Sequence, residues 1–230
     1  MTVRLYSYWR SSSAWRVRIG LGLKGIAFEI AAVNLLAGEQ FSEAHRARSP
    51  LGQVPVLEVE EGGRTLRLVQ SMAILEWLDE RYPDPPLLPA DLAGRARVRA
   101  LAEHVNSGIQ PLQNALILKM LRERQPGWEK EWARFHIARG LEALEQAVAD
   151  GLAGRFCHRD APGLADCYLV PQLANARRFG VELAPYPTLR RIEEACLALA
   201  PFQAAQAERQ PDAPAGERRP AGGASERRTP

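Results

Sequence analysis

Three consecutive serines, Ser11, Ser12 and Ser13, stand where a short strand-like segment gives way to a helical pattern. Serine is a favourable N-cap because its side-chain oxygen accepts a hydrogen bond from a free backbone N–H. One serine meets that need, so two hydroxyls are left to explain. A helix N-terminus also attracts anions through unpaired N–H groups and partial positive charge. The stretch alone fits two interpretations equally: a capped helix with two solvated serines, or a site that holds a thiolate.

Three further segments have the character of a ligand site. Pro55 at a strand start has no N–H for the sheet, and a cis bond there would turn the backbone of Val54 outward, but the sequence leaves the isomer open. Gln70-Ser71 at a second helix start suits a carboxylate, with an ordinary N-cap as the alternative. Residues 110–114 place amides around a proline in an apolar pattern, which indicates a cleft lining or a surface turn.

The elements that position these residues follow from hydrophobic periodicity. Alternation predicts a first strand over 3–7, and residues 15–23 and 28–33 predict a helix and a second strand. This β-α-β order implies a parallel pair joined by a right-handed crossover. A long polar loop leads to a predicted hairpin, 54–57 with 65–68, and then a helix over 72–82. We therefore expect a small mixed sheet covered by helices.

A proline-rich stretch from Pro83 to Pro89 ends this pattern, and every later periodic segment is helical. We expect an α/β domain over residues 1–83, a linker over 84–94 and an all-helical domain over 95–205. From 206 to 230 the chain is rich in Pro, Gly, Ala, Arg and Glu, which predicts a disordered tail.

Composition excludes several classes of protein. The 230-residue chain is 46% hydrophobic but has no apolar run long enough for a membrane span, and its first residues lack a secretory signal. Its three cysteines, Cys157, Cys167 and Cys196, share no CxxC spacing, so we expect small buried thiols in a reducing cytoplasm. Scattered histidines predict no metal site. A net charge of +3 without a basic, aromatic stripe argues against nucleic-acid binding.

Residues 20–25 match the GxGxxG pattern of dinucleotide sites. That pattern belongs at a strand-to-helix turn, whereas here it falls inside the first predicted helix. We interpret these glycines as small residues where the helix packs closely on the sheet.

Together these segments carry a resemblance to the zeta-class glutathione transferases, the family of the maleylacetoacetate isomerases. The matching stretches occur in the family's order between residue 4 and about residue 212. They are residues 6–19 (YSYWRSSSAWRVRI), 53–55 (QVP), 70–76 (QSMAILE), 108–114 (GIQPLQN), 165–172 (ADCYLVPQ) and 186–188 (YPT).

The resemblance implies a thioredoxin-like N-terminal domain that binds glutathione, a helical C-terminal domain and a homodimer. By family position, Ser11 would bind the glutathione sulfur beside Ser12 and Ser13, in a motif that continues through Ala14, Trp15 and Arg16. Backbone and carboxylate contacts to glutathione would come from Gln40, Val54, Gln70 and Ser71, with Gln110 and Asn114 near the cleft.

The chain departs from the family pattern at two positions. The family has Ser-Ser-Cys where this chain has Ser13 as the third residue. A protein cysteine as nucleophile would leave this chain inactive, whereas glutathione as nucleophile makes serine tolerable, and we favour the second interpretation. At Gly163 the family has Ser or Thr, so only the acidic half of a capping box, Asp166, remains.

The activity implied by the resemblance is glutathione-dependent cis–trans isomerisation of maleylacetoacetate to fumarylacetoacetate. Because the substrate is a dicarboxylate, Arg10 and Arg178 are candidates to hold its charge, with a solvated helix end as the alternative for Arg178. Other hypotheses are maleylpyruvate isomerisation, and glutathione transfer or dehalogenation on small α-halo acids. A glutathione-fold interaction protein without catalysis is the hypothesis from another class.

Overall fold

A four-stranded mixed sheet is built around β1 (Thr2–Ser7), whose alternate side chains Val3, Leu5 and Ser7 are buried. The computed structural model describes residues 1–218. β2 (Glu29–Ala32) pairs parallel to β1, and β3 (Val56–Glu61) pairs antiparallel to β1 and to β4 (Arg64–Val69), in the order β2-β1-β3-β4. The predicted parallel pair and hairpin are both confirmed.

The chain forms two units. Among the described residues, the sheet unit comprises residues 1–74 and 200–218, and the helical unit comprises Leu75–Leu199. Helix α3 (Ser71–Arg81) begins in the sheet unit and ends in the helical unit. These units differ from the boundary expected at residue 83, because the composition change marks the end of α3 rather than its start.

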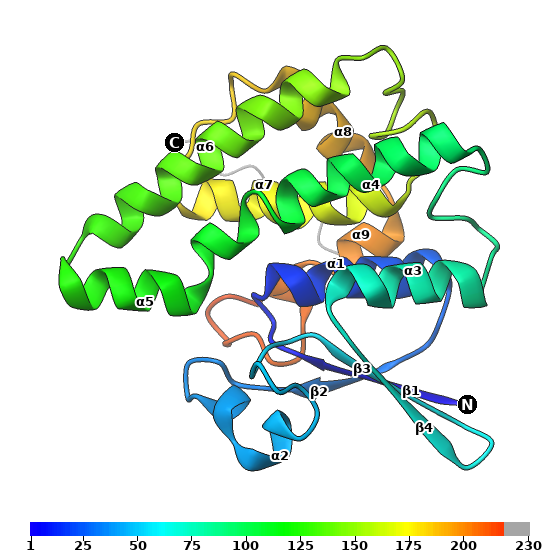
Figure 1. Ribbon diagram of the computed structural model, residues 1–230, viewed down its shortest axis with the longest axis vertical. Helices are drawn as coiled ribbons and strands as arrows, with labels where there is room; N and C mark the ends of the chain where they lie inside the picture. Colours follow the sequence, from blue (N-terminus) through cyan, green and yellow to red (C-terminus); the bar gives the residue numbers. More distant parts are fainter. Residues whose placement is uncertain (219–230) are drawn as a thin grey trace. The chain divides into compact units, whose positions relative to one another are not determined.

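In the sheet unit, α1 (Ser12–Leu23) and α2 (Glu43–Arg46) lie on opposite sides of the sheet (Figure 1). A short 3₁₀ turn, η1 (Glu39–Phe41), precedes α2. The GxGxxG glycines fall inside and just after α1, as expected. The close packing involves α9 (Ala200–Ala204) rather than the sheet, since a Cβ added at Gly22 would lie 3.1 Å from Pro201 Cβ.

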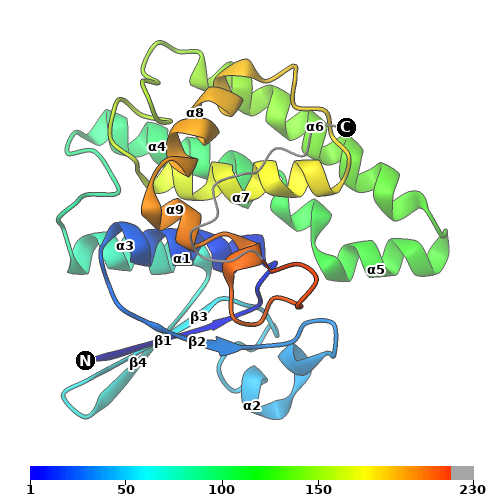
Figure 2. The same ribbon diagram turned by 180° about the vertical axis from the view of Figure 1, so that it is seen from behind.

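Residues 200–218 return to the sheet unit, where α9 packs on α1 (Figure 2). It continues through η3 (Ala207–Arg209) to residues whose side chains are buried, including Gln210 and Ala213. This corrects the expected disordered tail for residues 206–218, where polar contacts take the place of large apolar side chains. The rest of that expected tail, residues 219–230, lies outside the described part of the chain.

The helical unit is organised around α7 (Leu164–Arg178), which packs against the other long helices of the unit. These are α4 (Leu92–Asn106), α6 (Trp128–Val148) and α8 (Pro187–Leu197). Pro111 lies in a separate 3₁₀ turn, η2 (Gln110–Gln113), which divides α4 from α5 (Ala115–Arg124). The helical pattern is therefore interrupted at the proline, as the sequence predicts.

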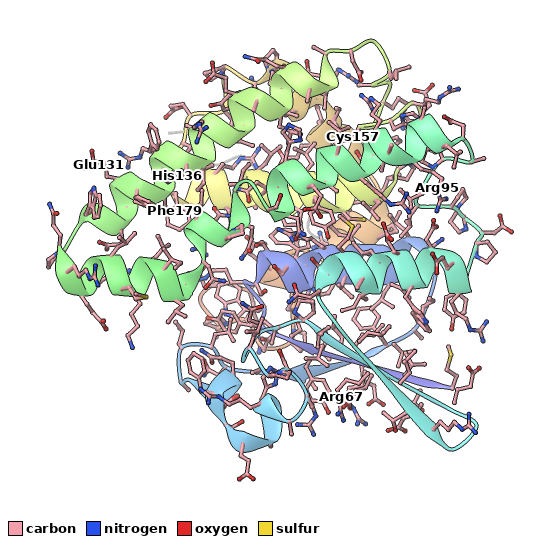
Figure 3. All side chains as sticks on the ribbon, in the orientation of Figure 1. Arg67, Arg95, Glu131, His136, Cys157 and Phe179 are labelled. Atoms are coloured by element: carbon pink, nitrogen blue, oxygen red, sulfur yellow. The ribbon has the colours of Figure 1, made fainter. Side chains whose placement is uncertain are left out.

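Asp166 holds the start of α7 from inside the helical unit. Its two carboxylate oxygens accept the backbone N–H groups of Gly163, at 2.8 Å, and Cys157, at 2.9 Å. The acidic half of the capping box is thus present without a hydroxyl partner. All three cysteines are buried and unbridged, as expected, and Cys157 lies among the helices (Figure 3). Within residues 1–218, no helix could cross a membrane and no three-residue metal-ligating group occurs.

Candidate active site

Three segments singled out by the sequence meet at one edge of the sheet. β1 and β3 are antiparallel with Tyr6 opposite Val56, and Val56 also lies opposite Val69 of β4. The chain leaving β1, the chain entering β3 and the chain leaving β4 are therefore neighbours. They carry, in that order, Ser11, Val54 and Gln70. Helices α1 and α3 begin directly after the first and third of these segments, so two positive helix ends face this edge.

Ser11 is the N-cap of α1, because its Oγ accepts the backbone N–H of Ala14 at 3.2 Å. A hydroxyl that accepts one hydrogen bond keeps its own hydrogen for donation. Ser11 and Ser13 are partly exposed, whereas Ser12 is buried. Of the three predicted hydroxyls, Ser11 therefore combines the helix end with a donor accessible to an anion.

The residues before β3 are fixed on both sides of Gln53. His45 Nε2 lies 3.0 Å from the carbonyl oxygen of Gln53, and Ser49 Oγ accepts the Gln53 backbone N–H at 3.2 Å. Both side chains come from α2 and the turn after it. The next bond, Val54–Pro55, is cis, which settles the isomer that the sequence left open.

The start of α3 holds an uncommon backbone conformation. Gln70 has φ of 70°, in the left-handed region, and its carbonyl accepts the N–H of Ile74 at 3.0 Å. Non-glycine residues in this region are infrequent and cluster at ligand sites. Ser71, which we expected as a cap, is the first helical residue, and its buried Oγ accepts Arg16 Nη1 at 3.1 Å.

Comparison with known proteins identifies the family. Residues 1–80 match the model of the glutathione S-transferase N-terminal domain. Maleylacetoacetate isomerase from Mus musculus is 46% identical over 92% of this chain and 95% of its own length. The chain belongs to the zeta-class glutathione transferases and maleylacetoacetate isomerases.

Solved structures extend this zeta-class assignment. A maleylacetoacetate isomerase from Anaeromyxobacter dehalogenans 2CP-1, with glutathione bound in its active site, is 76% identical over 93% of this chain and 98% of that chain, with a TM-score of 0.87. A second structure of that protein holds dicarboxyethyl glutathione and citrate. Maleylpyruvate isomerase from a Ralstonia species is 45% identical over 91% of this chain and 99% of its own length. The fold is therefore the predicted glutathione transferase fold.

The remaining zeta-class positions of the sheet unit differ in exposure. Gln40 lies in η1, partly exposed, and its Nε2 donates to the Leu35 carbonyl at 3.3 Å. Ala14, Trp15 and Arg16 are buried, so their side chains lie beneath the helix start rather than at its surface. Arg10 is partly exposed, with its guanidinium 5.2 Å from the ring centre of Trp9.

Three predicted site residues belong to the helical unit. Gln110 begins η2, and Asn114 caps α5 through its Oδ1, which accepts the Leu116 N–H at 3.0 Å. Arg178 ends α7 in an exposed position, with its guanidinium 4.6 Å from the ring centre of Phe179 (labelled in Figure 3).

Sequence reasoning missed the side chains that support the edge from beneath. His45 and Ser49 were left inside an irregular loop, although Ser42 is a typical cap for the short helix that carries His45. Arg18 was read only as part of a family motif, yet it is buried and donates to Ser7 Oγ at 3.0 Å. A buried arginine in an apolar helix is a signal that could have been found, because such a charge requires partners.

Proposed function

We propose that this chain catalyses the glutathione-dependent isomerisation of maleylacetoacetate to fumarylacetoacetate. The observation that carries the proposal is the 76% identity to a solved maleylacetoacetate isomerase with glutathione in its active site. The convergence of Ser11, Val54 and Gln70 at one sheet edge supports it independently, because such an edge presents helix N-termini and backbone groups to an anionic peptide.

The residues present fit glutathione. The left-handed Gln70 and the α3 N-terminus are suited to the γ-glutamyl carboxylate, with Ser71 at the first helical position. Val54 and Gln40 are suited to the peptide backbone. Bound glutathione supplies the thiolate that adds to the double bond, permits rotation about the resulting single bond and is eliminated unchanged.

The protein's part in that chemistry is to keep the sulfur ionised and aimed. Ser11 Oγ sits at the N-terminus of α1, where the helix end and a hydroxyl donor both favour the charged form. A thiol of ordinary pKa near 8.5 needs only a modest fall to ionise near neutral pH. Ser13 has no sulfur to contribute, which is consistent with a nucleophile that arrives with glutathione. Ser12 is buried, so its role is to fill the first turn.

A maleyl substrate brings two carboxylates to a site that already holds anions, so cations must be close. Arg10 and Arg178 are our proposed partners for these carboxylates. The dicarboxyethyl glutathione and citrate held by the Anaeromyxobacter relative support a site for multiple carboxylates. We assign Gln110 and Asn114 to the lining of the substrate side.

Maleylpyruvate is the second candidate substrate, because the Ralstonia maleylpyruvate isomerase matches this chain almost as well as the mouse enzyme does. An absorbance assay with both maleyl substrates, each with and without glutathione, separates the possibilities. Faster turnover of maleylacetoacetate that requires glutathione is expected. Exclusive turnover of maleylpyruvate would assign the second function, and glutathione binding without any turnover would indicate a non-catalytic protein.

A homodimer and a cytoplasmic location complete the proposal. Both rest on the zeta-class family and, for location, on three buried, unbridged cysteines. Sedimentation equilibrium of the purified chain would test the dimer, and a mass near the monomer's 25.5 kDa would refute it.

A further inference from the structure

The loop that delivers Ser11 to α1 is a tight turn. The Ser11 backbone N–H donates to the Tyr8 carbonyl at 2.9 Å, which closes a four-residue turn with Trp9 and Arg10 at its centre. Whatever fixes Trp9 therefore fixes the position of Ser11. Trp9 is itself almost fully buried.

Both backbone groups of Trp9 are held by side chains. Its N–H donates to Asp212 Oδ2 at 2.7 Å, across 203 residues of sequence. Its carbonyl accepts Arg18 Nη2 at 3.0 Å. A carboxylate on one side and a guanidinium on the other make both bonds charge-assisted, which is the stronger class of hydrogen bond.

Arg18 joins the turn to the end of the chain. Its Nε donates to the Ala205 carbonyl at 3.1 Å, while its Nη1 reaches Ser7 at the end of β1. Burial lowers the pKa of Arg18, and the carboxylates of Asp212 and Glu208 act in the opposite direction. The two acidic residues of the C-terminal segment, defined here as residues 205–213, therefore help to keep this buried guanidinium charged.

The C-terminal segment is itself held in shape. Gln210 Nε2 donates to the carbonyls of Ala204, at 2.9 Å, and Gln206, at 2.8 Å. The small side chains of Ala205, Ala207 and Ala213 are buried. A segment fixed in this way places the Asp212 carboxylate reproducibly, which a loosely attached tail would not do.

We propose that the C-terminal segment positions Ser11 for thiolate stabilisation, with Asp212 as its positioning residue acting through the Trp9 turn. The inference rests on the proposed role of Ser11 at the glutathione sulfur. It adds a long-range control of that role, since Asp212 contacts the turn and not the reacting atoms. A displacement of the turn would weaken the donor that favours the thiolate, and the pKa of bound glutathione would then rise.

The test compares Asp212→Ala with Asp212→Asn. Asparagine keeps an acceptor for the Trp9 N–H, so Asp212→Asn should stay within about threefold of wild type. Alanine removes the acceptor and should lower kcat about tenfold and raise the thiol pKa of bound glutathione by about one unit, as loss of a charge-assisted hydrogen bond predicts. Glu208→Ala is the matched control, because it removes a carboxylate near Arg18 but leaves the Trp9 bond.

The thiol pKa is read from ultraviolet absorbance of the glutathione complex, without any maleyl substrate. A failed isomerase assay would therefore refute the proposed function while this readout still tests the positioning. Amide hydrogen exchange of residues 8–14 should quicken in Asp212→Ala alone. If alanine lowers the melting temperature below the assay temperature, Asp212→Leu is used instead, because leucine has a similar shape to aspartate and no hydrogen-bond acceptor. An unchanged thiol pKa in the acceptor-free variant, or an equal change in Glu208→Ala, would overturn the proposal.

Discussion

Arg16 Nη1 donates to Ser71 Oγ at 3.1 Å inside the protein, so the second turn of α1 and the first turn of α3 are joined directly. Each of these helices contributes its N-terminus to the candidate glutathione site. A serine oxygen that accepts from a cation becomes a better donor through its own hydrogen, because hydrogen bonds in a chain polarise one another. The pair therefore links the part of the site proposed for the sulfur to the part proposed for the γ-glutamyl carboxylate.

A double-mutant cycle tests this link. We expect Arg16→Met and Ser71→Ala each to weaken glutathione binding by about tenfold, since a buried hydrogen-bonding partner is left behind in each case. The double variant should lose less than the product of the two, with a coupling of about 1–2 kcal/mol. The coupling is obtained from calorimetric Kd values for glutathione, measured for wild type, both single variants and the double variant. Strictly additive losses would show that the two side chains act separately.

Replacement of Ser11 is the most direct test of catalysis. Ser11→Ala should lower kcat by about a hundredfold, because one preorganised donor to the developing charge is lost. The helix cap lost with it costs about 1 kcal/mol of stability, so folding should survive. Ser13→Ala is the matched control, because Ser13 is also partly exposed and lies two residues further along the chain. Its kcat should remain within threefold of wild type. A larger loss of kcat in Ser13→Ala than in Ser11→Ala would make Ser13 the hydrogen-bond donor to the glutathione thiolate.

A second serine substitution tests the source of the nucleophile. Ser13→Cys restores the residue that the family carries at this position, and we expect little change in kcat because the reacting sulfur belongs to glutathione. A gain of tenfold or more would indicate that a protein thiol takes part in the reaction.

His45 supports the site through the Gln53 carbonyl, 3.0 Å from its Nε2. We expect His45→Ala to raise the KM for glutathione several-fold while kcat at saturation changes little, because the backbone of Val54 is proposed to bind the peptide and not the reacting atoms. Ser42→Ala removes the α2 cap without touching Gln53 and serves as control. Steady-state kinetics at a series of glutathione concentrations distinguish the two variants. Equal KM values for glutathione in His45→Ala and Ser42→Ala would show that His45 does not support the site.

Glu58 makes the stability of the sheet unit depend on pH. Burial acts to raise its pKa, but hydrogen bonds from Arg67 and Tyr6 and the charge of Arg48 outweigh this, so the pKa lies below its ordinary value of 4.5 (Arg67 is labelled in Figure 3). Its contribution to stability is complete above about pH 4.5 and is lost as the pH falls through the lower folded value. Glu58→Gln should therefore lower the melting temperature at pH 7. Its melting temperature should also fall less than that of wild type as the pH is lowered into the acid range. If the melting temperatures of wild type and Glu58→Gln fell equally steeply as the pH is lowered, this prediction would be contradicted.

Local periodicity predicted most of the elements. α6 (Trp128–Val148) is one of the helical segments that periodicity predicts after Pro89, because its apolar face repeats along the whole length and its internal Gly140 does not end it. The sequence predicted that one of three consecutive serines caps the first helix without deciding which, and in the structure Ser11 caps α1. Both features depend on residues within a few positions of each other, which is the range over which sequence patterns carry information.

The contacts that fix the site from afar were not predictable in this way. Asp212 reaches Trp9 across 203 residues, from a segment whose small and polar side chains resemble those of a disordered tail. The sequence therefore predicted a disordered tail from residue 206 onward. The structure corrects that expectation for residues 206–218, where the side chains of Gln210 and Ala213 are buried.

The proposed substrate charge can be tested at Arg178, which is exposed at the end of α7 with its guanidinium over Phe179. We expect Arg178→Ala to raise the KM for a dicarboxylate substrate about thirtyfold while the Kd for glutathione changes little, because a charge-assisted contact to the substrate alone is removed. Arg190→Ala, at another exposed position of the helical unit, is the control. A neutral ester of the substrate should be insensitive to Arg178→Ala. If Arg178→Ala raises the KM for the neutral ester as much as the KM for the dicarboxylate, Arg178 has a structural role, and Arg10 remains as the proposed cation at the substrate.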